Sequence, residues 1–289
     1  MKSLKDIRTI AIVGAGAMGS SIAQVAAMVG YDTLVYDINS DQLEKAKKNI
    51  ERNLDIGIEK KKLTVALKND AVNRLKFTYD LSEVKADIII EAIVEKLEVK
   101  QELFKQLAFK NSANTILATN TSSIPITRIA TGIQNPERVV GMHFFMPAHI
   151  MKLVEVVSGA MTDQSISEII KLLAEKMGKI PVMVKDSPGF IVNRVARHYY
   201  VESLKILEEN VSSAQDIDVL VESAGFKMGP FRLMDFVGND VNFSVTSSLF
   251  ESFHYDPKFR PSRIQEQKVE SGQLGRKSGK GFYDYSQTS

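Results

Sequence analysis

The segment TIAIVGAGAMGSS, which begins at Thr9, constrains the fold of this chain more than any other stretch. Residues 9–13 form a short apolar run rich in β-branched side chains, which favours a strand. Glycines follow at once in a G-x-G-x-x-G pattern, and a helical pattern covers residues 20–29. A second apolar run, residues 32–36, comes next. Strand, glycine turn, helix and strand in this order predict a parallel sheet covered on both faces.

The glycines of the turn each meet a different need of dinucleotide binding. Gly14 permits the tight turn, Gly16 lets a pyrophosphate approach the helix N-terminus, and Gly19 allows close packing of helix on strand. Asp37 ends the second strand, where its carboxylate can accept hydrogen bonds from the adenosine ribose hydroxyls. The same charge would repel a 2′-phosphate, so the sequence predicts NAD rather than NADP. A glycine turn kept only for packing is the alternative.

Apolar runs alternate with helical patterns up to about residue 185. Further strands are expected at 76–78, 87–92, 115–119, 139–143, 153–157 and 181–184. The turn-forming cluster Asp186-Ser187-Pro188-Gly189 ends this alternation, and helical patterns follow at 192–209, 214–224 and 239–253. We therefore predict a Rossmann-like α/β domain with a mostly parallel sheet over residues 1–185, and an all-helical domain over residues 186–289.

Composition limits the possible partners. A net charge of +2 gives no case for nucleic acid as a partner. The chain has no cysteine, which excludes disulfides, thiolate catalysis and cysteine-ligated metals, and we expect no metal site. No run approaches the roughly 20 apolar residues that span a bilayer. The first apolar run is also too short for a signal peptide, so we expect a cytoplasmic protein without membrane partners.

Ordered motifs along nearly the whole chain resemble those of one family, the L-3-hydroxyacyl-CoA dehydrogenases of the 3-hydroxybutyryl-CoA type. They are GAGAMGSSIA (14–23), EAIVEKLEVK (91–100), ATNTSSI (118–124), HFFMPAHIMKLVEVV (143–157), DSPGFIVNR (186–194), GPFRLMDFVG (229–238) and GRKSGKGFYDY (275–285). The resemblance implies a reversible oxidation in which the 3-hydroxyl of an acyl-CoA loses a proton to a histidine while C3 gives hydride to NAD.

The resemblance also implies roles for single residues. The base would be His143 and its partner Glu155, with Ser122 and Asn193 near the reacting oxygen and the thioester. Implied cofactor contacts are Gly14, Gly16, Met18, Gly19, Asp37, Glu95, Lys100, Ser122, Met146 and Lys277, and implied CoA contacts are Asn53, Lys60 and Ser122. The family further implies a homodimer through the helical domain, for which apolar residues within 231–243 and 250–255 are candidates.

Two positions depart from the family pattern. The family motif reads H-F-F-N-P, and its Asn contacts the cofactor near the nicotinamide, but Met146 stands at that position here. A thioether cannot replace the donors and the acceptor of an amide, so the loss of this contact must either weaken cofactor binding or be compensated by other groups. Asn53 stands where the family often has Ser, and both residues can hydrogen-bond.

His143 and Glu155 are ionisable groups in a mostly apolar stretch, which predicts that they satisfy each other. Glu155 lies too far along the chain for a helical contact but can lie on a neighbouring strand. A histidine at the carboxyl end of a parallel strand faces the crevice where ligands bind. With Nδ1–H directed at the carboxylate, Nε2 would accept a proton and the imidazolium would be stabilised. A core histidine satisfied by Glu155 is the alternative.

The other histidines are weaker candidates. His149 is closer to Glu155 in sequence, but it follows Pro147-Ala148 and is expected to be a surface or rim residue in a connecting loop. His198 and His254 have no acid at a convincing spacing and are expected to be structural.

Other functions stay open at this point. The chain could be a hydroxy-acid dehydrogenase without CoA, or a nucleotide-bound protein without turnover. The lysines within 45–62 could form a solvated helix face, and Ser122 could cap a helix starting near Ile124. Asn193 could be only a helix cap or a surface residue. Lys60 and its neighbours, together with the match at 151–157, favour the CoA enzyme.

Overall fold

The computed structural model describes residues 3–286, and the chain divides into two compact units, with the boundary along the chain between Ser187 and Pro188. The sequence prediction put the boundary between residues 185 and 186. Within the described residues, no helix is long and apolar enough to cross a membrane. The first unit carries the sheet, and the second contains helices and short turns.

In the part of the chain that the structure describes, the first unit is built on one eight-stranded sheet. Its strands are β1 Thr9–Val13, β2 Asp32–Tyr36, β3 Leu75–Thr78, β4 Ile88–Glu91, β5 Ile116–Thr119, β6 Val139–Phe144, β7 Leu153–Ser158 and β8 Ile180–Lys185. The strand order is β3-β2-β1-β4-β5-β6-β7-β8. Neighbours from β3 to β6 are parallel, β7 runs antiparallel to β6, and β8 runs parallel to β7.

This topology brings the ends of several strands together along one edge of the sheet, the edge that runs across the strands. The carboxyl ends of β1 to β6 share that edge, and β7 begins there because it runs in the opposite direction. The predicted fold class, a mostly parallel Rossmann-like sheet followed by a helical domain, is confirmed. The reversal of β7 was not predicted.

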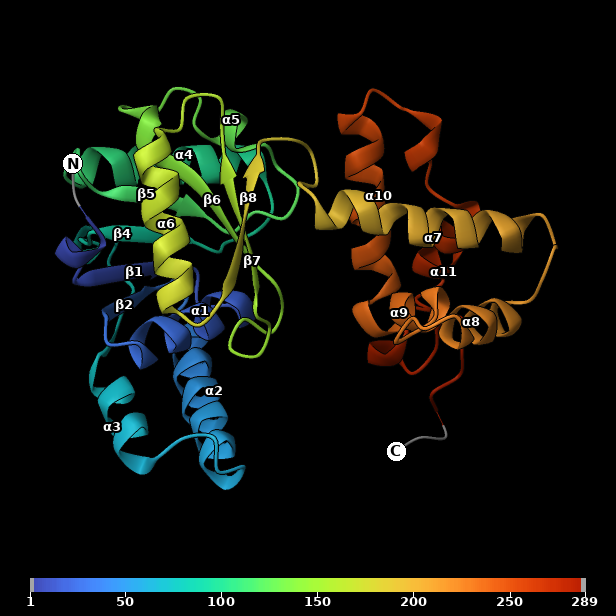
Figure 1. Cartoon of the computed structure of the whole chain (residues 1–289), viewed down its shortest axis with the longest axis horizontal. Helices are drawn as coiled ribbons and strands as arrows, with labels where there is room; N and C mark the ends of the chain where they lie inside the picture. The colour runs from blue at the N-terminus through green and yellow to red at the C-terminus, as the bar shows by residue number, and fades with distance from the viewer. Residues whose placement is uncertain (1–2, 287–289) are drawn as a thin grey trace. The chain divides into compact units, whose positions relative to one another are not determined.

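Helices cover both faces of the sheet. In Figure 1, α6 lies in front of the sheet and α4 behind it, and α2 and α3 extend away from the sheet as a pair. The helices are α1 Ala17–Met28, α2 Ser40–Glu59, α3 Val65–Asn73, α4 Leu97–Lys110, α5 Ile126–Ile129 and α6 Gln164–Lys176, with 3-10 turns at Leu4–Asp6, Leu81–Glu83 and Pro136–Arg138. Residues of α1, α2 and α6 share one core with the central strands. Cover on both faces explains why β4, β5 and β6 are buried at every residue.

The second unit packs its helices around a small core of Tyr200, Leu204, Ile217, Phe231 and Met234. The helices are α7 Val192–Glu208, α8 Ala214–Ser223, α9 Pro230–Val237, α10 Asn239–Ser252 and α11 Arg263–Glu270, with 3-10 turns at Pro257–Phe259 and Arg276–Ser278. The named sequence patterns predicted α7, α8 and α10. They missed α9 and α11, which have 8 residues each and show little more than two helical turns of periodicity.

Two buried carboxylates organise this unit. Asp218 accepts hydrogen bonds from the backbone N–H groups of Phe231 and Arg232 and so caps the start of α9. Asp235 accepts from the N–H groups of Phe282 and Tyr283 and so fastens the C-terminal tail.

Candidate active site

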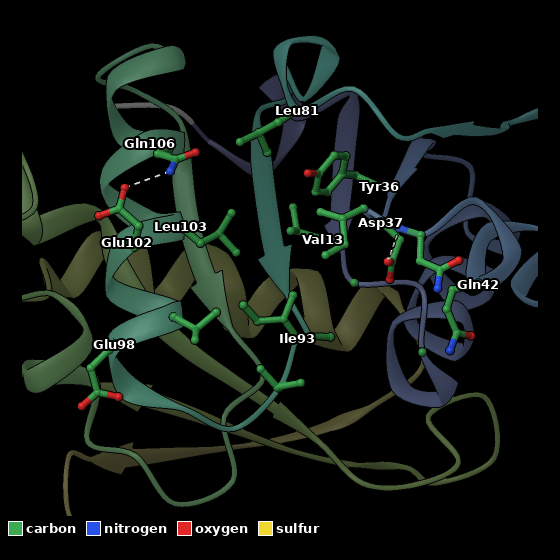
Figure 2. Close-up of a pocket in the computed structure, with 17 residues that line it drawn as sticks. Val13, Tyr36, Asp37, Gln42, Leu81, Ile93, Glu98, Glu102, Leu103 and Gln106 are labelled. Carbon is green, nitrogen blue, oxygen red and sulfur yellow. Dashed lines mark hydrogen bonds between the residues drawn. The ribbon is translucent and has the colours of Figure 1, made fainter.

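A pocket of about 830 Å³ opens at the carboxyl ends of β1 and β2 (Figure 2). Gly14, Gly16 and Asp37 line it on the strand side. In Figure 2, Glu98, Glu102 and Gln106 of α4 stand on the opposite side, with the apolar side chains of Val13, Leu81, Ile93 and Leu103 between. An apolar slot with an acid at one wall suits the adenosine end of a dinucleotide.

The glycine turn has the shape that a pyrophosphate needs. Gly14 has a φ of +104°, and a Cβ there would lie 2.6 Å from the carbonyl oxygen of Ala92. A Cβ on Gly19 would lie 1.7 Å from the carbonyl oxygen of Gly14, so the helix can approach the turn this closely only with glycine at position 19. A Cβ on Gly16 would meet nothing within 4 Å, and Gly16 is the N-cap of α1. The start of this helix is therefore open to an anion, and the turn fits a dinucleotide.

Asp37 is held beside the turn by the backbone. Its Oδ2 accepts a hydrogen bond of 2.8 Å from the N–H of Ala15, and its Oδ1 accepts one of 3.0 Å from the N–H of Asn39. Each carboxylate oxygen keeps a further lone pair that can accept from a ribose hydroxyl. The fixed negative charge would also repel a 2′-phosphate.

Glu95, Lys100 and Ser122 come together where β4 and β5 end. Glu95 Oε1 accepts hydrogen bonds from the N–H and the hydroxyl of Ser122, at 2.8 and 3.1 Å. Lys100 is buried, with its ammonium 3.3 Å from Glu95 Oε2 and 2.5 Å from Glu91 Oε1. Burial raises the pKa of Glu95, but the Lys100 charge and the hydrogen bonds from Thr121 and Ser122 outweigh it, so the pKa lies below its ordinary value. Glu95 is therefore ionised at neutral pH.

Sequence reasoning missed one member of this group and misjudged another. Glu91 is fully buried beneath Lys100, and the only sequence signal was a glutamate closing an otherwise apolar strand. The suggestion that Ser122 caps a helix starting near Ile124 is wrong, because α5 starts at Ile126 and its N-cap is Pro125. Thr121 supplies the local hydrogen bond instead, by accepting from the N–H of Ile124.

His143 and Glu155 face each other across the antiparallel pair β6–β7. They are direct partners in the register, and His143 Nδ1 lies 2.7 Å from Glu155 Oε2. Both side chains are buried, and the ring of Phe145 lies 4.6 Å from the imidazole, centroid to centroid. The end of β6 is also tied to β5, because Asn120 Oδ1 accepts from the N–H of Phe144 at 2.8 Å. The structure thus brings together the two residues that the sequence singled out.

The loop between β6 and β7 holds Met146 and His149. Met146 is 62% exposed, so it is not part of the core. His149 is half-buried, and its Nδ1 lies 2.9 Å from the hydroxyl of Ser21 in α1. Burial, and then the charge of Lys179, lowers the pKa of His149. The partner of His149 is a hydroxyl, whereas that of His143 is a carboxylate.

The remaining predicted site residues lie elsewhere in the two units. In α2, Asn53 is half-buried and donates a hydrogen bond of 3.2 Å to Gln24 Oε1, and Lys60 is exposed as the C-cap. In the second unit, Asn193 is the second residue of α7, whose N-cap is Ile191, so Asn193 is not the cap. Lys277 is exposed and forms an ion pair of 2.6 Å with Asp240.

Comparison with known proteins agrees with these features. The family model "3-hydroxyacyl-CoA dehydrogenase, NAD binding domain" matches residues 9–187, and "3-hydroxyacyl-CoA dehydrogenase, C-terminal domain" matches residues 189–285. The chain belongs to the 3-hydroxyacyl-CoA dehydrogenase family. The family resemblance predicted from the sequence is therefore confirmed, as is NAD as the cofactor that its first domain binds.

Individual members of the family are also similar along nearly the whole chain. A probable 3-hydroxybutyryl-CoA dehydrogenase of Bacillus subtilis is 42% identical over 97% of this chain and 98% of its own length. A 3-hydroxyadipyl-CoA dehydrogenase of Escherichia coli is 47% identical over 97% of this chain, which spans 59% of that longer protein. The crystal structure of (S)-3-hydroxybutyryl-CoA dehydrogenase from Ralstonia eutropha matches with a TM-score of 0.93 and 38% identity, over 96% of this chain and 99% of that one.

Asp37 predicts a preference between cofactors. We expect NADH to bind at least about tenfold more tightly than NADPH, a difference of about 1.4 kcal/mol, because the carboxylate repels the 2′-phosphate. Fluorescence titration with both cofactors measures this ratio. Asp37→Ala should bring the affinities for NADH and NADPH closer together. Asp41 is an exposed acid at the start of α2, and Asp41→Ala should leave the ratio of the two affinities unchanged. Equal binding of both cofactors by the unmodified protein would contradict this role.

Met146 predicts the effect of restoring the family amide. Met146→Asn should tighten NADH binding by a few-fold to about tenfold, since one hydrogen bond contributes about 0.5–1.5 kcal/mol. Stability should hold, because the side chain is exposed. Met161 has the same exposure of 62% but follows β7, at the opposite edge of the sheet, so Met161→Asn is the matched control. An equal effect of both variants on NADH affinity would show that Met146 does not face the cofactor.

Proposed function

We propose that this chain catalyses the reversible, NAD-dependent oxidation of L-3-hydroxyacyl-CoA to 3-ketoacyl-CoA, with a short acyl chain such as that of 3-hydroxybutyryl-CoA. The observation that carries the proposal is the 2.7 Å contact between His143 Nδ1 and Glu155 Oε2. It lies at the sheet edge that also carries the glycine turn. Relatives named for 3-hydroxybutyryl-CoA and 3-hydroxyadipyl-CoA support the substrate class.

The contact with Glu155 suits His143 for general base catalysis. Because Nδ1–H donates to the carboxylate, Nε2 is the ring nitrogen that takes the proton from the 3-hydroxyl. NAD, held by the glycine turn and Asp37, would supply the acceptor for the hydride that leaves C3. The imidazolium forms beside a buried anion, which stabilises it without competition from bulk water. In the reverse direction, His143 returns the proton to the 3-keto oxygen.

Other residues complete the proposed site. We assign Ser122 and Asn193 to the reacting oxygen and the thioester, and Lys277 to the cofactor, as the family pattern implies. The exposed ammonium of Lys60 suits a phosphate of CoA, and Asn53 lies on the same helix. Ser122 donates two hydrogen bonds to Glu95, which fix its backbone and its side chain. Its hydroxyl oxygen would then accept a hydrogen bond from the 3-hydroxyl of the substrate.

We also propose that the chain forms a homodimer through its helical unit. Phe236, Val237, Val241 and Tyr255 lie within the two segments named from the sequence and are 42–65% exposed. Exposed apolar side chains of this number on one small unit favour an interface. The cytoplasmic location stays a prediction from the sequence.

Substrate choice tests the proposed activity directly. Oxidation of NADH, followed by absorbance, should be fast with acetoacetyl-CoA and slow with free acetoacetate, because only the thioester brings the CoA group that α2 would bind. Lys60→Ala should raise the KM for acetoacetyl-CoA and leave kcat unchanged. Lys48→Ala, an exposed lysine of the same helix, serves as the control and should change neither. Equal turnover of both substrates would favour a hydroxy-acid dehydrogenase without CoA, and no turnover of either would favour a protein that only binds the nucleotide.

The two histidines of the β6–β7 region should differ sharply on substitution. His143→Ala should lower kcat by about 10²–10⁴-fold, as the loss of a positioned general base does. His149→Ala should change kcat by no more than a few-fold, since its ring contacts a serine of α1. Glu155→Gln should also lower kcat strongly, because the charge that stabilises the imidazolium is removed. Steady-state kinetics measures kcat for each variant, and the affinity for NADH serves as a check that the variant is folded. A larger loss of kcat in His149→Ala than in His143→Ala would overturn the assignment.

A further inference from the structure

A buried ion cluster lies under the turn that follows β5. It consists of Lys100 and two carboxylates, with the ammonium 2.5 Å from Glu91 Oε1 and 3.3 Å from Glu95 Oε2. Glu91 and Lys100 are 0% and 1% exposed, whereas the side chain of Glu95 is 36% exposed and forms the outer end. One positive and two negative groups leave the cluster with a net charge of −1.

Both carboxylates accept hydrogen bonds from neighbouring groups. Glu91 accepts from the N–H of Ile93 and the hydroxyl of Thr119, each at 2.7 Å. Glu95 accepts from the hydroxyl of Thr121 at 2.7 Å and from Ser122, as described above. Donors aimed at a carboxylate favour its charged form. The exposed end of the cluster is Glu95, whose pKa lies below its ordinary value, so this end carries a negative charge at neutral pH.

The cluster lies along the path that the cofactor must follow. The adenosine pocket includes Gly14 of the β1 turn and continues to Val94, which directly precedes Glu95. In the sheet, β4 and β5 separate β1 from β6, the strand that carries His143. If the proposed function holds, hydride leaves the carbon whose hydroxyl His143 deprotonates. The nicotinamide half must then extend from the glycine turn past the ends of β4 and β5, where Glu95 is exposed.

The nicotinamide ring is the one part of the cofactor whose charge changes in the reaction. It carries a positive charge when oxidised and none when reduced, while the adenosine and pyrophosphate stay the same. We propose that the cluster of Glu91, Lys100 and Glu95 sets the relative affinity for the two forms, favouring NAD⁺ over NADH through its net negative charge. This inference rests on the proposed function, and it assigns Glu91 as a positioning residue that holds Lys100 against Glu95.

The competing explanation is that the cluster only supports the turn of Ser122. Both explanations predict that damage to the cluster weakens cofactor binding. They differ in the ratio of the two affinities, because loss of support affects both forms equally, whereas loss of charge affects mainly the cationic form. The ratio is thus the readout that a purely structural role would not change.

Glu95→Gln is the test variant, measured by calorimetric titration of the full chain with NAD⁺ and with NADH. Glutamine keeps the length and one accepting oxygen but removes the charge. We expect NAD⁺ affinity to fall by about three- to tenfold more than NADH affinity, the effect of one unit charge at a partly solvated edge. Glu95→Asp keeps the charge and should preserve the ratio of the unmodified protein even where both affinities drop.

Two controls separate charge from contact. Glu102→Gln makes the same chemical change on α4, at the adenosine end of the pocket, and should shift both affinities equally. Thr121→Val removes a hydrogen bond to Glu95 without a change of charge and should also preserve the ratio. An unchanged ratio in Glu95→Gln, or an equal change of the ratio in Glu95→Asp, would overturn the proposal. Failure of both nucleotides to bind the unmodified protein, or binding without turnover of acetoacetyl-CoA, would instead contradict the proposed function.

Discussion

The contact between Glu155 and His143 depends on a single reversal of chain direction in an otherwise parallel arrangement. Because β7 runs antiparallel to β6, Glu155 lies directly opposite His143 at the edge where the earlier strands end. A carboxylate and an imidazole buried separately would each be costly to desolvate. Facing each other at 2.7 Å, they satisfy each other and fix the orientation of the ring. Strand direction therefore decides which imidazole nitrogen is directed away from the carboxylate.

A second buried pair, Glu91 and Lys100, lies at the same edge two strands away, and the two pairs are linked through the backbone. Asn120 donates its N–H to the carbonyl oxygen of Glu91, and its side chain accepts from the N–H of Phe144, next to His143. A buried ion pair is weak support for stability, since desolvation opposes its attraction. Here the pair instead fixes the positions of Glu95, Ser122 and the end of β6 relative to one another.

Much of this site could be predicted from the sequence because its strongest signals are local. The glycine turn, Asp37 and the bounds of β2 follow from short motifs, and His143 and Glu155 stand out as ionisable groups among apolar neighbours. The antiparallel β7 was missed, although the short connection of residues 145–152 left no room for the crossover that a parallel strand needs. The role of Glu91 could not be predicted, because the sequence showed only a glutamate at the end of an apolar strand. The burial of Lys100 could not be predicted either, because it depends on which face of a charged helix packs against the sheet. The contact of His149 with Ser21 joins distant segments and leaves no local pattern.

The orientation of the His143 ring is the claim from which the proposed catalysis follows, and nitrogen NMR of the labelled protein tests it most directly. The His143 signals can be assigned by comparison with His143→Gln and recorded at a pH where the ring is neutral. We expect Nδ1 to carry the proton and Nε2 to be unprotonated, and we expect Glu155→Gln to weaken this preference. A neutral ring protonated on Nε2 in the unmodified protein would contradict the assignment of His143 as a base oriented by Glu155.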